Sequence, residues 1–183
     1  MRSIAAAMLA GPISLEAGQH VHATTANETK AAGGVYKPKC LNPHEFETLK
    51  MLCEIIVPGA SKGGAAEFID LLSSQNPEMA AIHTGGLAWI DRNMEHNTGK
   101  SFLAATTEER TALLDKIAYR KNRTAELSQG VRYFDWARRM TVDAYYTSAA
   151  GIKEVGFKGN RATAKFTVPQ EAIDYALKRS PFA

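Results

Sequence analysis

Residues 42–58 read NPHEFETLKMLCEIIVP, and this stretch decides the fold class. Asn42 is a good helix N-cap, Pro43 suits the first helical position, and Glu45 occupies the third. Apolar side chains then recur at helical spacing, at Phe46, Leu49, Cys53 and Ile56. We therefore expect an amphipathic helix from Pro43 that ends before Pro58.

The same start signals return along the chain. Asn76-Pro77 repeats Asn42-Pro43, and Thr106 with Glu109 forms a second capping-box pattern. Helices are expected to begin near residues 43, 66, 77, 107, 131 and 169. Sustained strand alternation is missing, and 165–168 is the only short candidate. The sequence predicts an all-α fold, an irregular bundle of five or six helices with a Gly/aromatic-rich C-terminal loop segment.

The composition fits one globular domain. The chain has 183 residues, of which 45% are hydrophobic and 22% charged, and this length can bury a core without metals or disulfides. A net charge of +3 permits an acidic partner without requiring a nucleic acid.

The N-terminus resembles a short secretory signal. Met1-Arg2 precedes an apolar run over 4–10, and Val21-His22-Ala23 fits a small-residue cleavage site. The predicted organisation is a signal segment over 1–23, a flexible leader over 24–40 and a single helical domain over 41–183, with a periplasmic location. Two alternatives stay open: a disordered cytoplasmic N-terminus, and a late start codon that hides a twin-arginine signal.

Cys40 and Cys53 are the two cysteines. Cys53 lies ten residues into the predicted helix, about 15 Å along its axis, and Cys40 precedes the helix. Bridged Cα atoms lie within about 7 Å, so we expect a buried Cys53 thiol and a separate Cys40. An intermolecular bond from Cys40 is a further hypothesis.

Residues for chemistry do not converge in the sequence. The five histidines lack the i,i+3 or i,i+4 spacing of a helical metal site, and His83 fits a half-buried structural residue. Cys53 on an apolar face would have a raised pKa and low reactivity. Glu108 and Glu109 fit a helix N-terminus through capping and the helix dipole. We predict no catalytic, metal or cofactor residues in this chain.

A basic region with interleaved aromatic residues lies between 119 and 139. Its members are Arg120, Lys121, Arg123, Arg132, Arg138 and Arg139 with Tyr119, Tyr133 and Trp136. It fits a docking face for an acidic protein or a solvated face, and a nucleic-acid surface is the weaker alternative. Gly156-Phe-Lys-Gly159 matches a Gly-x-x-Gly loop, but the strands of a KH domain are missing.

Three blocks together resemble subunit 3, the gamma or small subunit, of gluconate 2-dehydrogenase. The first joins 41–58 to 64–72. The second joins GGLAWID at 85–91 to 99–102 and 107–118. The third is FDWARRMTVDAYYTS at 134–148, continued through 151–160. The blocks cover about 41–160, and their order and spacing carry the resemblance. One departure is the loop at 59–65, which is shorter than is usual in that family.

The resemblance implies a subunit without a cofactor of its own. A separate large subunit of the glucose–methanol–choline type would bind FAD and oxidise a sugar or sugar acid, and a cytochrome c would accept electrons in some complexes. The small subunit would stabilise this partner and accompany it in export, including by the twin-arginine pathway, and would meet the membrane only through the complex. The Gly-Leu-Ala-Trp-Ile-Asp pattern is similar to subunits paired with glycoside 3-dehydrogenases.

Residues 144–160, AYYTSAAGIKEVGFKGN, then invite a role in docking. Tyrosine is common at interface hot spots, and glycines allow close backbone approach. The predicted partner interface comprises Arg138, Arg139, Tyr145, Tyr146, Gly151, Gly156, Phe157, Gly159 and Asn160. The alternative is a helix-to-loop transition that packs on its own core.

The function expected is therefore that of a non-catalytic dehydrogenase subunit without activity alone. Two other classes stay open: an export chaperone that is not retained in the enzyme, and a nucleic-acid-binding helical domain.

Overall fold

The computed structural model describes residues 14–159 and 167–180, and every regular element in these residues is helical. The described residues form eight α-helices, more than the five or six predicted, and two 3₁₀ turns. In order they are α2 (Leu15–Ala31), α3 (Pro43–Ile56), η1 (Ala60–Gly63), α4 (Ala65–Gln75), α5 (Pro77–Thr98), α6 (Thr107–Ile117), η2 (Arg120–Asn122), α7 (Ser128–Tyr146), α8 (Ala149–Glu154) and α9 (Gln170–Leu177).

The cap signals place the helix starts correctly. Asn42 and Glu45 form a reciprocal capping box at α3, and Thr106 and Glu109 form another at α6. Asn76 accepts hydrogen bonds from two backbone N–H groups at the start of α5. The all-α prediction is confirmed among the described residues. Residues 167–168 form no strand, and the other half of the strand candidate, 165–166, lies outside the described residues.

Two helices were not expected from the sequence, α2 and α8. Helix α2 covers the first part of the segment predicted as a flexible leader, so 24–31 are helical in this structure. Helix α8 has six residues and begins after its cap Ser148, whose hydroxyl accepts from the Gly151 N–H. It occupies part of the segment expected to be a loop, because a serine cap stabilises a short turn that hydrophobic periodicity does not reveal.

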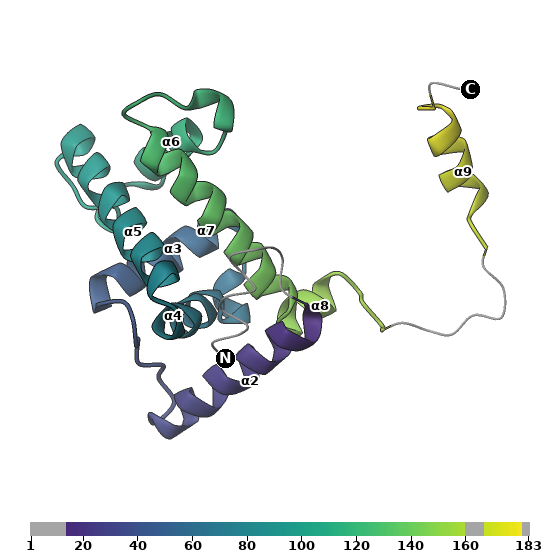
Figure 1. Ribbon diagram of the computed structural model, residues 1–183, viewed down its shortest axis with the longest axis horizontal. Coiled ribbons are helices and arrows are strands. Elements are labelled where there is room, and N and C mark those ends of the chain that lie inside the picture. The colour runs from purple at the N-terminus through teal and green to yellow at the C-terminus, as the bar shows by residue number, and fades with distance from the viewer. Residues whose placement is uncertain (1–13, 160–166, 181–183) are drawn as a thin grey trace.

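Helices α3, α4, α5 and α7 enclose the core, and α5 runs beside α7 (Figure 1). Two glycines bring α5 and α7 close together. A Cβ atom at Gly86 would lie 2.1 Å from the Tyr133 ring, and one at Gly130 would lie 2.3 Å from Trp89. Each helix therefore provides a glycine for an aromatic ring of the other, and larger side chains at these two positions would separate the pair.

The chain before α3 is fixed by one carboxylate, Asp70 of α4, which is fully buried. It accepts hydrogen bonds from the Tyr36 hydroxyl at 2.9 Å and from the backbone N–H groups of Lys39 at 2.7 Å, Cys40 at 3.1 Å and Leu41 at 2.9 Å. Residues 36–40 of the predicted leader, and Leu41 after them, are thus attached to the body, because a buried carboxylate needs such donors.

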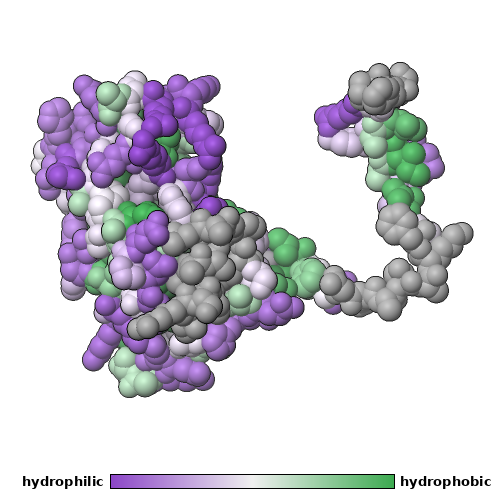
Figure 2. Space-filling view, in the orientation of Figure 1, coloured by the Kyte–Doolittle hydropathy of each residue, from purple (hydrophilic) through white to green (hydrophobic). Residues whose placement is uncertain are grey.

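Helix α9 differs from the other helices. It lies apart from the body in Figure 1, and none of its residues is buried. Apolar surface gathers along it in Figure 2, where Ile173, Tyr175 and Leu177 are exposed.

Candidate partner-binding surface

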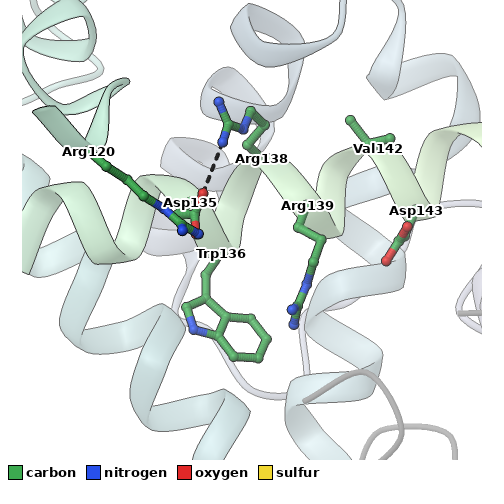
Figure 3. A pocket seen from close by; sticks show the side chains of 7 residues that line it. All are labelled: Arg120, Asp135, Trp136, Arg138, Arg139, Val142 and Asp143. Atoms are coloured by element: carbon green, nitrogen blue, oxygen red, sulfur yellow. Dashed lines mark hydrogen bonds and ion pairs between the residues drawn. The ribbon is translucent and has the colours of Figure 1, made fainter. Parts of the chain in front are cut away.

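Helix α7 has one buried face and one exposed polar face. Val131, Phe134 and Met140 of the buried face pack into the core. The other face carries Arg132, Arg138 and Arg139 of the basic region together with Trp136 and Val142. Seven residues line a shallow hollow of about 420 Å³ there (Figure 3), namely Arg120, Asp135, Trp136, Arg138, Arg139, Val142 and Asp143.

Two guanidinium groups share one carboxylate in this hollow. Arg120 contacts Asp135 at 2.6 Å and Arg138 contacts its other oxygen at 2.9 Å. The hydrogen bond from Arg120, with the nearby charge of both arginines, lowers the pKa of Asp135. This group of three keeps one net positive charge. The side chains of Arg120 and Arg138 remain 82% and 49% exposed, so this charge faces solvent.

An aromatic ring lies beside this charge. The Arg139 guanidinium stands 4.1 Å from the centroid of the Trp136 ring, a cation–π distance, and both side chains point to the same side of α7 in Figure 3. Val142 adds a side chain that is 38% exposed. Positive charge next to a half-buried aromatic and an exposed aliphatic group is a composition typical of protein interfaces.

At the C-terminal end of α7, the side chain of Tyr145 points into the subunit. Tyr145 is 5% exposed, and its hydroxyl donates to Glu154 at 2.5 Å, which raises the pKa of Tyr145. Its ring covers η1, where a Cβ atom at Gly63 would lie 2.7 Å from the ring. Gly151 is also buried, with its Cβ position 2.2 Å from the Tyr145 carbonyl oxygen. In this conformation Tyr145 and Gly151 pack within the subunit, as the alternative reading of 144–160 expected.

The other predicted interface residues lie at the surface. Tyr146 is half-buried and contacts Tyr145 edge to face, and Phe157 is 47% exposed. Gly156 and Gly159 have φ angles of 65° and 81°, a region that glycine favours, so the chain after α8 needs glycine at both turns. Asn160 lies outside the described residues. The contact of this set with a partner stays a prediction.

A second hollow, which the sequence did not indicate, lies between α2 and η1. It has a volume of about 730 Å³, and Thr25, Tyr36, Lys62 and Glu67 are among the residues that line it. Burial raises the pKa of Glu67. Its walls come from two stretches that are well separated in sequence, 22–36 and 61–67, so no local motif indicates it.

The buried titratable side chains His83 and Cys53 pack within the core. His83 is fully buried, which lowers its pKa to about 4, and its Nε2 lies 3.2 Å from the Met140 sulfur. Burial raises the pKa of Cys53 to about 12, and Thr141 donates to its sulfur at 3.3 Å. Cys40 and Cys53 are both free thiols. Within 14–159 and 167–180, no three His, Cys, Asp or Glu side chains are placed to hold a metal ion.

The described part of the chain contains no helix that is long and apolar enough to cross a membrane.

Comparison with known proteins gives one result. The family model for gluconate 2-dehydrogenase subunit 3 matches residues 43–164, which span α3 to α8. Searches of curated proteins and of solved structures found no match. The matched region is two thirds of the chain and includes both the core and the exposed face of α7. The chain therefore belongs to the gluconate 2-dehydrogenase subunit 3 family.

Proposed function

We propose that this chain is the non-catalytic small subunit of a periplasmic sugar or sugar-acid dehydrogenase. It binds an FAD-containing large subunit of the glucose–methanol–choline type, stabilises it and accompanies it in export. The observation that carries the proposal is the family match over residues 43–164, because that family is named as one subunit of a dehydrogenase.

The finer parts of the proposal concern the complex. The Gly-Leu-Ala-Trp-Ile-Asp pattern at 86–91 favours a glycoside 3-dehydrogenase as the large subunit. A cytochrome c is proposed as an electron acceptor, and the twin-arginine pathway as the export route. FAD belongs to the partner subunit in this proposal.

The exposed face of α7 and the chain after α8 are the proposed docking surface. Arg120 and Arg138 supply an exposed positive charge, and Trp136 lines the same hollow. Phe157 supplies an exposed aromatic ring in the chain after α8. Charge and aromatic area of this kind favour an acidic protein partner.

The first experiment is an affinity purification of the tagged chain from periplasmic and membrane fractions of its native host. The eluate is analysed for subunit stoichiometry, flavin absorbance and sugar-dependent dye reduction. We expect a yellow, active partner in equal amount. A colourless lone chain at native abundance contradicts the proposal, and an equimolar flavoprotein found only before export would instead identify an export chaperone.

The docking surface has its own test. Charge reversal of Arg138 to Glu should weaken the complex at least tenfold, and more steeply at low salt, while Arg92→Glu on α5 is the matched control. Replacing Tyr146 and Phe157 by Ala should weaken association and leave the subunit folded, with Val35→Ala, at an exposed position before α3, as the control. Unfolding of the Tyr146/Phe157 variant would instead assign this segment to the core.

A further inference from the structure

The predicted cleavage site falls inside a packed helix. Cleavage between Ala23 and Thr24 would divide α2, which runs without interruption from Leu15 to Ala31 and begins with a Ser14 cap. The Ser14 hydroxyl accepts from the Ala17 N–H at 3.3 Å. Proteolysis favours exposed loops with few backbone hydrogen bonds, and a helix interior is the opposite case.

The residues before this site hold α2 to the body. Val21 is fully buried. Gly18 lies against Thr147 after α7, so closely that a Cβ atom at Gly18 would stand 2.5 Å from the Thr147 Cβ. Position 18 therefore admits only glycine without displacing Thr147, a short side chain that cannot move aside easily.

His22 adds a directional bond to the same junction. Its Nε2 lies 2.8 Å from the Ala144 carbonyl oxygen and 3.2 Å from the Thr147 hydroxyl. Its ring also contacts Phe68 of α4, with the ring centroids 4.8 Å apart. Because a carbonyl oxygen only accepts, Nε2 carries the proton in this contact. One side chain of α2 thus meets both α4 and the end of α7.

Removal of 15–23 would uncover this junction. The buried positions Gly18, Val21 and Thr25 recur every three or four residues along one face, and cleavage after Ala23 would leave only Thr25 of them. The remaining eight helical residues, 24–31, would be too short for a stable helix without that packing.

We infer that residues 15–31 remain in the mature subunit as a structural helix, and that any cleavage of an export signal takes place before Ser14. The inference rests on the packing of α2 and does not depend on which partner the subunit binds.

The test begins with the intact mass and N-terminal sequence of the chain purified from its native host. We expect a mature chain that begins at Ser14 or earlier. A chain that begins at Thr24 overturns the inference.

A second measurement compares the stability of variants. If residues 15–23 were cleaved off, a substitution among them could not change the stability of the mature protein. Gly18→Val should lower the melting temperature of the mature product purified from the native host by roughly 5 °C or more, and Gln19→Val, on the exposed face of the same helix, by much less. His22→Ala is the milder variant if Gly18→Val does not accumulate. If the Gly18→Val and His22→Ala variants both melt at the temperature of the wild type, the inference is contradicted.

Discussion

Helix α2 and helix α9 stand near opposite ends of the described chain, and only α2 packs on the body. Helix α9 has the clearer apolar face, with Ile173 and Leu177 one turn apart, yet these side chains are 37% and 54% exposed. Helix α2 is polar, but Gly18 and Val21 are buried. The close fit of Gly18 on Thr147 and the hydrogen bond of His22 therefore matter more for the docking of a terminal helix than the number of its apolar side chains.

The largest expected effect comes from breaking the attachment of residues 36–41, which joins α2 to α3. Asp70→Ala removes the acceptor of four hydrogen bonds and leaves buried donors unpaired. We expect the free energy of unfolding to fall by about 4 kcal/mol. Urea denaturation followed by tryptophan fluorescence measures it.

Asp115→Ala, at an exposed position of α6, is the control for Asp70→Ala and should change little. In the Asp70 variant, amide exchange in α2 should approach that of α9. Unchanged protection of α2 would show that this helix is held without the Asp70 carboxylate.

Acid should lower the stability of the body and the attachment of α2, because both contain a histidine whose pKa is lowered by burial, whereas α9 contains no histidine. Burial lowers the pKa of His83 from 6.5 to about 4, so the unfolded chain binds the proton first. Stability contributed by neutral His83 is complete above pH 6.5 and is lost as pH falls toward 4, by about 3 kcal/mol in total. Burial also lowers the pKa of His22, which adds loss of the same sign.

Urea unfolding between pH 7.5 and 4.5 checks this pH dependence, with His83→Leu as the test variant. The variant should show a flatter profile in that range, and His96→Leu, near the exposed end of α5, should follow the wild type. Equal slopes for the wild type and the His83 variant would assign the acid response to other groups.

A smaller effect is expected from trimming α2 itself. Val21→Ala deletes two buried methyl groups and should lower the free energy of unfolding by about 2 kcal/mol. The exposed Val168, before α9, provides the matched substitution, and Val168→Ala should be neutral within about 0.5 kcal/mol. If Val21→Ala and Val168→Ala lowered the free energy of unfolding by similar amounts, α2 would be no more firmly packed than the chain before α9.

The smallest effect should follow the deletion of α9. A chain that ends after Gly159 should melt within about 2 °C of the full chain, because no residue of α9 is buried. Differential scanning calorimetry of both chains decides this. A decrease of several degrees would mean that α9 packs on the body in solution.

The sequence predicted the fold where local signals exist. Asn42, Glu45, Thr106 and Glu109 are recognisable because a cap and its helix lie within four residues of each other. Helix α2 was missed because Gly18 and Thr25 are not apolar markers, and the acceptor of His22 is 122 residues away. Such long-range complementarity has no local pattern.

Some residues of the predicted interface lie at the surface and others are buried, for a similar reason. Arg138 and Arg139 were expected on an exposed helix face, and the structure places them there. Tyr145 and Gly151 were grouped with them, yet both are buried, because the direction of a side chain at a helix end depends on the segment it meets. Here that segment is η1, with Gly63 beneath the tyrosine ring.

The position of Asp70 also imposes an order on synthesis. The groups that it binds, from Tyr36 to Leu41, leave the ribosome some thirty residues ahead of it. Until α4 emerges, residues 36–41 have no acceptor for these hydrogen bonds. Helix α2 finds its own contacts later still, because Ala144 and Thr147 at the end of α7 are made after Asp70. The segment before α3 can therefore be fixed to the body before α2 is.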